Sequence, residues 1–356
     1  MNILSLFDGM SCGQQALERA RIKVDNYFAS EIDKYAIQVT MANYPNTKQL
    51  GSVVNVDGYS LPKIDILIGG SPCQSFSFAG KRKGMSTKDE QEILTLNHYL
   101  ELKAEGFEFE GQSYLFWEYM RLLNEVKPKY FLLENVMMGE KWEKILSKAI
   151  GVKPIMINSS LISAQNRQRL YWTNIGLEPQ GLFADLETTI KQPKDLEILL
   201  KDILEPEVNE KYFLSGKFIE FLNNQKERHL DKGTGFGFKA KQEDKKANCL
   251  RANAALCPTN NMIEVIPMDF RFDEGFRPRT NGKSPTLCIS NDSNSLSGKS
   301  LVLINKKLRR LTPIESERLQ TVKDNYTNHV SDSQRYKMLG NGWTVDVIVH
   351  ILSYIK

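Results

Sequence analysis

The chain has 356 residues, of which 41% are hydrophobic and 25% are charged, so it is not a disordered, collagen-like or low-complexity protein. Its 47 Lys and Arg residues exceed its 43 Asp and Glu residues by only 4, which excludes a strongly basic tail but not a local basic face. The length predicts about two domains.

The first half of the chain alternates short apolar runs with amphipathic helical patterns. Strands are predicted at residues 2–7, 27–29, 64–68, 130–133, 155–157 and 170–172, and helices at 13–21, 34–41, 115–126 and 142–149. Strands that alternate with helices in this way indicate βαβ units. We therefore predict an α/β fold with a largely parallel sheet.

This alternation ends after about residue 175. Residues 185–305 are rich in Asn, Gly, Lys and Ser and predict short strands and loops, and helical patterns return at 313–320 and 345–354. We predict a first domain over residues 1–184 that residues 335–356 return to complete. Residues 185–334 would form a second domain with its hinge.

Cysteine usage and the N-terminus bear on the cellular compartment. The five cysteines are an odd number and form no C-x-x-C pair, which argues against a disulfide framework and a structural zinc site. The N-terminus lacks the basic start of a signal peptide, and no apolar run reaches the ~20 residues needed to span a bilayer. We expect a cytoplasmic protein without a metal or a membrane partner.

Three polar clusters follow predicted strands, where ligands bind in open α/β sheets. Residues 7–13 form a glycine-containing turn before a helix, and Glu31 follows the second strand, where an acid can bind ribose hydroxyls. The alternative is a plain strand–turn–helix with a surface acid.

The second cluster is formed by residues 69–77, which place Cys73 in a loop of small residues as an accessible thiol. The alternative is that Cys73 is an inert packing residue, as most cysteines are.

The third cluster begins with Glu134, at the end of a very apolar strand. A partly desolvated carboxylic acid there could act as an acid or hydrogen-bond donor, or it could cap the next helix. Arg167 and Arg169 follow; in a strand they would share one face, which suits a phosphate or carboxylate, unless they are a solvated basic pair.

Together these segments resemble the DNA cytosine-C5 methyltransferase family. The motifs, in chain order, are F-D-G-x-x-x-G (7–13), S-P-C-Q (71–74), E-N-V (134–136), Q-x-R-x-R (165–169), L-T-P-x-E-x-x-R-L-Q (311–320) and G-N-G-W (340–343). The resemblance covers residues 1–175 and 306–356. Residues 5–13, 23–25 and 29–31 also look like the animal de novo branch, whereas the length and the tail look like bacterial or phage enzymes.

The resemblance implies a Rossmann-like methyltransferase domain that uses S-adenosyl-L-methionine and releases S-adenosyl-L-homocysteine. Residues 185–305 would be the smaller, irregular, β-rich target-recognition domain. By the resemblance, Cys73 adds to C6 of a flipped-out cytosine, Glu134 contacts its N3 and amine, and Arg167 and Arg169 position the base. The cofactor residues implied are Phe7, Asp8, Gly9, Met10, Ser11, Cys12, Glu31, Ile32, Ser52, Val53, Gly70, Pro72, Leu115, Asn341, Gly342 and Trp343.

The same resemblance implies double-stranded DNA as the partner of a monomer in a bacterial or phage-infected cell, and possible membership of a restriction-modification system. The candidate DNA-binding residues are Gln74, Ser75, Ser77, Lys81, Arg82, Lys83, Arg271, Arg277, Arg279, Thr286 and Leu287. Residues 84–112 would be a mobile loop that closes over the DNA. Ser52 stands where the family usually has an adenine-binding acid, and Trp343 differs from the smaller residues of bacterial members.

Two other functions fit the motifs less well. One is a tRNA cytosine-C5 methyltransferase, and the sizeable 185–305 region argues against it. The other is a catalytically silent DNA-binding relative, and the intact Cys73, Glu134, Arg167 and Arg169 argue against that.

Overall fold

The computed structural model describes residues 1–72, 85–180, 185–231, 241–252, 261–265, 268–271, 275–278 and 307–356. The strands are β1 (Asn2–Leu6), β2 (Asn26–Ser30), β3 (Lys48–Gln49), β4 (Ile66–Gly70), β5 (Tyr130–Val136), β6 (Ile155–Asn158), β7 (Gln165–Asn166), β8 (Gln168–Thr173), β9 (Leu177–Gln180), β10 (Asp185–Thr188), β11 (Ala247–Asn248), β12 (Met262–Val265), β13 (Met268–Arg271), β14 (Gly275–Pro278) and β15 (Lys307–Arg310). The α-helices are α1 (Cys12–Arg19), α2 (Lys34–Asn43), α3 (Leu96–Ala104), α4 (Phe116–Val126), α5 (Glu140–Ile150), α6 (Gly216–Asp231), α7 (Pro313–Leu319), α8 (Asp332–Asn341) and α9 (Val345–Leu352).

A seven-stranded sheet in the order β3-β2-β1-β4-β5-β8-β6 forms the centre of the fold. The pairs from β3 to β5 are all parallel, and β8 lies antiparallel to both β5 and β6. The α/β fold with a largely parallel sheet is therefore confirmed. The strand order reverses between β1 and β4, which is where such sheets leave a crevice for ligands.

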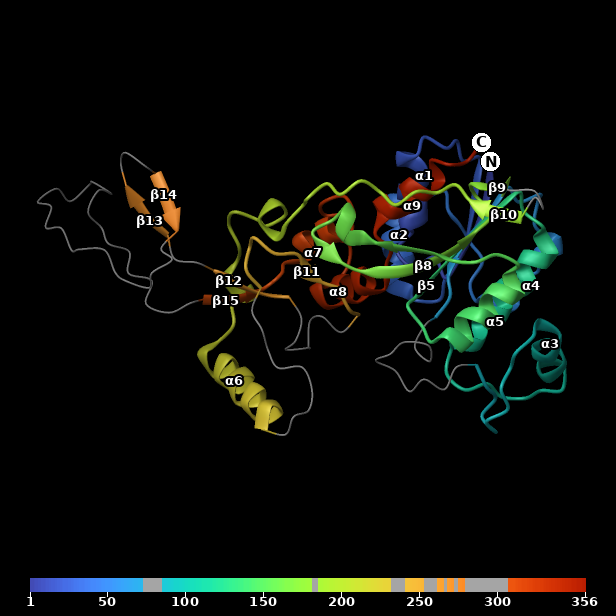
Figure 1. The fold of residues 1–356 in the computed structure, drawn as a ribbon, viewed down its shortest axis with the longest axis horizontal. Coiled ribbons are helices and arrows are strands. Elements are labelled where there is room, and N and C mark those ends of the chain that lie inside the picture. The colour runs from blue at the N-terminus through green and yellow to red at the C-terminus, as the bar shows by residue number, and fades with distance from the viewer. Residues whose placement is uncertain are drawn as a thin grey trace, which may run out of the picture.

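Alternate residues of the strands face opposite helical layers, as the period of two in a strand requires. Ile3, Ile66 and Ile68 pack with α1 and α9 in one buried cluster. Leu4, Leu67 and Leu133 belong to a second cluster with α4 and α5. Figure 1 shows α1 and α9 side by side, and α4 and α5 together elsewhere around the sheet.

The final helix returns to the first, as the sequence predicts for residues 345–354. Val345, Val347, Ile348, Ile351 and Leu352 of α9 are buried in the cluster that holds Ala16 and Leu17 of α1. Arg19 on α1 also forms an ion pair with Asp346 on α9, with 2.7 Å between Nη1 and Oδ1. The helix α8, which precedes α9, was not predicted from the sequence.

Residues 85–112 are folded against α4, so the expectation of a mobile loop over 84–112 is wrong for these residues. Met85, Ile93, Tyr99 and Leu102 are all buried in the cluster on the α4 side of the sheet. The buried Glu118 of α4 accepts hydrogen bonds from Tyr99 Oη and Lys103 Nζ, each at 2.5 Å. Its other oxygen accepts from Arg121 Nε at 2.7 Å.

The region after residue 185 departs in part from the predicted short strands and loops. Gly216–Asp231 forms a helix of 16 residues that the polar composition did not suggest. Short antiparallel pairs do occur, between β12 and β15 and between β13 and β14. The division at residues 184 and 334 remains a prediction, as does the recognition role of the second part.

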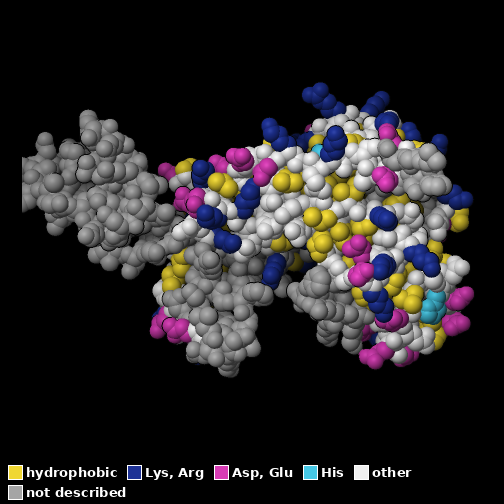
Figure 2. Space-filling model, in the orientation of Figure 1, with side chains coloured by type: hydrophobic (Ala, Val, Ile, Leu, Met, Phe, Trp, Pro, Cys, Tyr) yellow, Lys and Arg dark blue, Asp and Glu magenta, His cyan; other side chains and the backbone are white. Residues whose placement is uncertain are grey.

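The surface charge is mixed on the face of the molecule drawn in Figure 2, where Lys and Arg side chains are interspersed with Asp and Glu. That distribution agrees with the small net charge of +4. Within the described ranges of the chain, no helix is long and apolar enough to cross a membrane.

The docking of α3 depends on Glu118, and Glu118→Ala tests it. Removing this buried acid leaves Lys103 without its ion pair and leaves Arg121 with Glu125 as its remaining carboxylate partner, and we expect a loss of about 3 kcal/mol in the free energy of unfolding. Residues 85–112 should also become sensitive to limited proteolysis. Glu101→Ala, at an exposed site on α3, is the matched control and should change neither property. Equal behaviour of the two variants would contradict this account.

Candidate active site

The turn between β1 and α1, residues 7–11, has an unusual backbone. Phe7, Gly9 and Ser11 all have left-handed φ values, of 58°, 58° and 62°. A bulky residue such as Phe7 adopts this conformation only at a cost of about 1–3 kcal/mol, and such strain clusters at functional sites. Glu31, just after β2, holds the turn because its Oε2 accepts the Gly9 N–H at 2.7 Å.

The residues behind this turn pack closely on the sheet. A Cβ at Gly13 would lie 2.5 Å from Ile68 Cδ1 and 2.8 Å from Tyr27 Oη, so a larger residue there would require these side chains to move. Burial raises the pKa of Cys12 to about 12, which keeps that thiol protonated and makes it a poor nucleophile. Ser11 is fully buried and its hydroxyl accepts from Gln14 Nε2 at 2.9 Å, so it does not line the cavity described below.

Asp8 lies in the same turn with one carboxylate oxygen unpaired. Its Oδ1 accepts the Tyr27 hydroxyl at 2.7 Å, whereas Oδ2 is buried without a hydrogen-bond partner. Burial raises the pKa of this carboxyl group to about 6. A buried carboxylate without a cation is costly, and its presence beside a cavity indicates a functional requirement.

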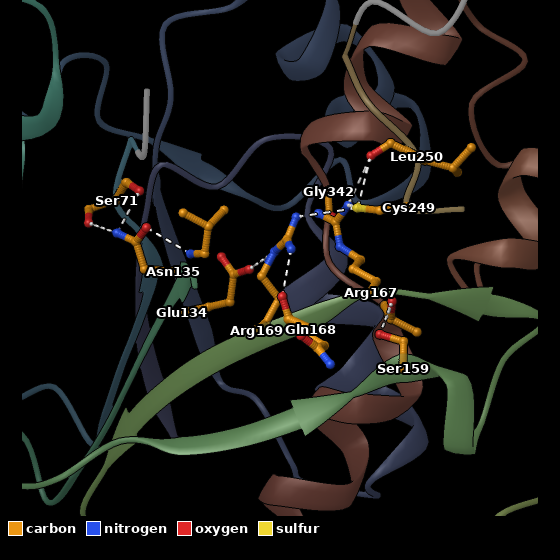
Figure 3. Close-up of polar contacts among 12 residues, drawn as sticks. Ser71, Glu134, Asn135, Ser159, Arg167, Gln168, Arg169, Cys249, Leu250 and Gly342 are labelled. Carbon is orange, nitrogen blue, oxygen red and sulfur yellow. Dashed lines mark hydrogen bonds and ion pairs between the residues drawn. The ribbon is translucent and has the colours of Figure 1, made fainter. Parts of the chain in front are cut away.

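Asn135 fixes the chain at the end of β4. Its Nδ2 donates to Ser71 Oγ at 3.0 Å and to the Ser71 carbonyl at 3.3 Å (Figure 3). Ser71 lies two positions before Cys73 in the sequence. Cys73 itself lies outside the described residues, so its predicted role stays a prediction.

Glu134 and Arg169 form an ion pair, with 2.9 Å between Arg169 Nε and Glu134 Oε1 (Figure 3). Glu134 lies within β5, and the N-cap of α5 is Gly139, five residues later. The alternative that Glu134 caps the helix is therefore wrong. A buried acid held by a guanidinium is oriented for hydrogen bonding to a substrate.

Arg167 is engaged by the protein itself. It is 3% exposed, and its guanidinium donates to the carbonyl oxygens of Gly342 at 2.8 Å, Leu250 at 3.1 Å and Gly340 at 3.3 Å. Both interpretations from the sequence are therefore wrong for Arg167: it is not part of a solvated basic pair, and its guanidinium is not free to bind a phosphate. Arg167 instead ties together chain segments that are far apart in the sequence.

Cys249 also lies at this site, and the sequence analysis did not select it. It follows β11, which pairs with β7, and its Sγ accepts from Arg167 Nη1 at 3.2 Å and Arg169 Nη2 at 3.7 Å. Burial opposes ionisation, but the two guanidinium groups outweigh it and lower the pKa of the Cys249 thiol. No local motif marks this cysteine, because its partners come from a distant strand.

These elements enclose a cavity of about 340 Å³, within the range of small-molecule sites. Gly70 lines it, and a Cβ added there would lie 2.9 Å from Trp343 Nε1 and 3.1 Å from Glu134 Oε2. Most predicted cofactor residues and the described catalytic ones line it, namely Phe7, Asp8, Gly9, Met10, Cys12, Glu31, Ile32, Ser52, Val53, Gly70, Pro72, Leu115, Glu134, Arg167, Arg169, Asn341, Gly342 and Trp343.

The cavity wall includes residues that the sequence analysis missed. Asp33 and Lys337 face each other there as an ion pair of 2.7 Å, and Ser71 and Gln112 also contribute. The signal of Asp33, Gln112 and Lys337 was weak, because each is a single polar residue outside the motifs. Ser71 is the first residue of the S-P-C-Q motif and could have been selected from it.

Two of the predicted DNA-binding residues lie in the part of the chain that the structure describes. Arg271 lies on β13 and Arg277 on β14, in a hairpin apart from the seven-stranded sheet (Figure 1). The remaining candidates, Gln74, Ser75, Ser77, Lys81, Arg82, Lys83, Arg279, Thr286 and Leu287, lie outside the described residues.

Comparison with known proteins decides the family. The model of the family described as C-5 cytosine-specific DNA methylase matches residues 1–356. The chain belongs to this family. It is therefore an enzyme that methylates C5 of cytosine in DNA, in a family that uses S-adenosylmethionine.

Similar curated proteins are type II methyltransferases. M.NlaX of Neisseria lactamica is 28% identical over 369 residues, which cover 99% of this chain and 96% of that protein. M.HpaII of Haemophilus parainfluenzae is 28% identical over 336 residues, 90% of this chain and 80% of its own length. This methylase thus spans most of each relative.

Solved structures agree on the fold. The methyltransferase EhMeth of Entamoeba histolytica superposes with a TM-score of 0.65 at 18% identity, covering 99% of this chain and 97% of its own. A DNMT2 mutant of Spodoptera frugiperda superposes with a TM-score of 0.61 at 20% identity, covering 99% and 98%. At these identities the likeness concerns the fold alone.

The contrasting partners of the two arginines give a testable difference. Lysine at position 169 can still pair with Glu134, whereas lysine at position 167 cannot reach three carbonyl groups that lie in different directions. We expect Arg167→Lys to lower the free energy of unfolding by about 3 kcal/mol and Arg169→Lys by about 1 kcal/mol or less, measured by urea denaturation. Equal losses would contradict the role assigned to Arg167.

Proposed function

We propose that this methylase transfers the methyl group of S-adenosylmethionine to C5 of a flipped-out cytosine in double-stranded DNA, with Cys73 as the nucleophile. One observation carries the proposal: a single cavity joins the β1–α1 turn, the C-terminal residues 341–343, the Glu134–Arg169 pair and residues 70–72. Residue 72 directly precedes Cys73 in the sequence. Cofactor and substrate groups would thus meet at one edge of the sheet.

The cavity suits S-adenosylmethionine by its chemistry. Ile32, which is 70% exposed, and Phe7 both line the cavity. Their side chains offer apolar faces for the adenine ring. Glu31 would bind the ribose, and Ser52 the adenine amine in place of the usual acid. The turn residues that line the cavity, Asp8, Gly9, Met10 and Cys12, would hold the amino-acid end. The unpaired buried oxygen of Asp8 marks a site that accepts positive charge. When bound, the cofactor supplies an electrophilic methyl group and leaves as S-adenosylhomocysteine.

The chain's own residues would activate the cytosine. The Cys73 thiolate adds to C6 of the ring, which makes C5 a nucleophilic, carbanion-like centre. Glu134 hydrogen-bonds N3 and the exocyclic amine, where charge changes during this addition. Arg169 orients Glu134 through their ion pair of 2.9 Å. Arg167 is a positioning residue, because it holds residues 340–342, which form part of the cavity wall, through their carbonyl groups. Loss of the C5 proton and release of Cys73 then complete the turnover.

A covalent trap tests the nucleophile. Duplex DNA with 5-fluorocytosine at the target cannot lose a C5 proton, so incubation with the wild-type enzyme and cofactor should give a stable protein–DNA adduct. Cys73→Ala should give no adduct and no methyl transfer while still binding duplex DNA. Bisulfite sequencing of DNA treated with the enzyme identifies the methylated cytosine. A tRNA transcript is the control substrate, because it distinguishes a DNA methyltransferase from the alternative tRNA enzyme. Normal turnover by Cys73→Ala would overturn the mechanism.

The role of Glu134 is tested by Glu134→Gln. The amide keeps the shape of the side chain but cannot transfer a proton as a carboxylic acid can. It also weakens the pairing with Arg169. We expect methyl transfer to fall by about 10²–10³-fold, the range for losing one such stabilising group. Cofactor affinity, measured by calorimetry, should change little. A variant with unchanged turnover would show that Glu134 does not act on the ring.

A further inference from the structure

The acids that line the cavity fall into two kinds. Asp33 is paired with Lys337 and Glu134 with Arg169. Among the described residues, Asp8 and Glu31 have no ion-pair partner although both line the same cavity. Glu31 is satisfied by backbone N–H groups, since Oε1 accepts from Ile32 and Asp33 and Oε2 from Gly9. Asp8 alone keeps a buried oxygen without any partner.

The groups that face Asp8 do not neutralise it. They are the hydroxyl groups of Ser5 in β1, Ser11 in the turn and Tyr27 in β2, the Glu31 carboxylate after β2, the Cys12 thiol from α1 and the Tyr326 hydroxyl from the segment between α7 and α8. All of these groups are neutral or acidic. The cations nearest to Cys12 are engaged elsewhere, Arg19 with Asp346 and Arg167 with backbone carbonyls.

The two forms of the cofactor differ in charge as well as in one methyl group. S-adenosylmethionine carries a positive sulfonium, and S-adenosylhomocysteine carries a neutral thioether. Their adenosine, ammonium and carboxylate groups are the same. An uncompensated negative charge in a site of reduced dielectric therefore acts on the difference between them.

We propose that Asp8 is the residue that makes this cavity prefer the sulfonium cofactor over the neutral product. The inference rests on the proposed function, because it requires the cofactor to bind in this cavity. Above pH 6 the carboxylate is ionised and stabilises the positively charged ligand. Once the methyl group has left, that attraction is lost, which favours exchange of the product for new cofactor.

Calorimetric titrations of the full-length protein without DNA test this selectivity. S-adenosylmethionine, S-adenosylhomocysteine and sinefungin, in which a protonated amine replaces the methylsulfonium, are titrated into wild type and Asp8→Asn at pH 8. The amide keeps the Oδ1 acceptor for Tyr27. We expect the Kd ratio of product to cofactor to fall about tenfold in Asp8→Asn, which corresponds to about 1.4 kcal/mol. Sinefungin should follow the cofactor.

Tyr27→Phe is the matched control. It removes the hydrogen bond to Asp8 Oδ1 but leaves the charge in place, so the affinity ratio at pH 8 should stay at the wild-type value. A pH series adds a second readout. Because the pKa of Asp8 is about 6, the wild-type ratio should fall as the pH is lowered from 8 through 6, and the Asp8→Asn ratio should stay constant.

The outcomes separate this inference from the proposed function. If wild type binds both ligands and Asp8→Asn weakens both equally, or changes neither, the selectivity assigned to Asp8 is wrong while the cavity remains a cofactor site. If Tyr27→Phe changes the ratio as much as Asp8→Asn, turn geometry rather than charge is responsible and the inference fails. If folded wild type binds neither ligand, the proposed function fails and the inference with it.

Discussion

The reversal of strand order between β1 and β4 is the constraint on which the site depends. The chain leaves β1 and β4 in opposite directions across the sheet, so the segments that follow these two strands diverge and leave a crevice between them. The strained β1–α1 turn forms one wall, and residues 70–72 form the other. Parallel pairing of β4 with β5 then brings Glu134 opposite Gly70, which places the substrate-side acid next to the cofactor side.

A second requirement is that distant chain segments close the crevice, and Arg167 links them. Its guanidinium contacts carbonyls at residues 250, 340 and 342, so the strand region, the segment after β11 and the C-terminal wall share one hydrogen-bonding centre. Arg169 lies beside it and joins Glu134 to Cys249. Residues 249–250 are thereby connected, through Arg167 and Arg169, to the acid proposed to contact the cytosine.

The sequence predicted what depends on local pattern. Apolar runs gave β1, β2, β4 and β5, and the polar residues that follow those strands meet at one edge because parallel strands end there. It did not predict the partners of Arg167, the approach of Cys249 or the docking of α3, since each depends on residues 15 to 175 positions apart. The helix α6 was missed because its many Asn, Lys and Arg residues obscure a weak apolar face.

Asp8 shows most clearly how stability and function conflict at this site. Its pKa is 3.8 in an unfolded chain and about 6 in the fold, so the folded protein retains a proton that the unfolded chain releases between these values. The contribution of Asp8 to stability therefore falls as the pH rises from about 4 to 6, and the penalty at neutral pH is roughly 3 kcal/mol. An amide or alanine would avoid this penalty while the turn is held by Glu31 and Gly9. A negative charge retained at such a cost, in the wall of a cavity for a cationic ligand, is most simply explained by what it does to that ligand.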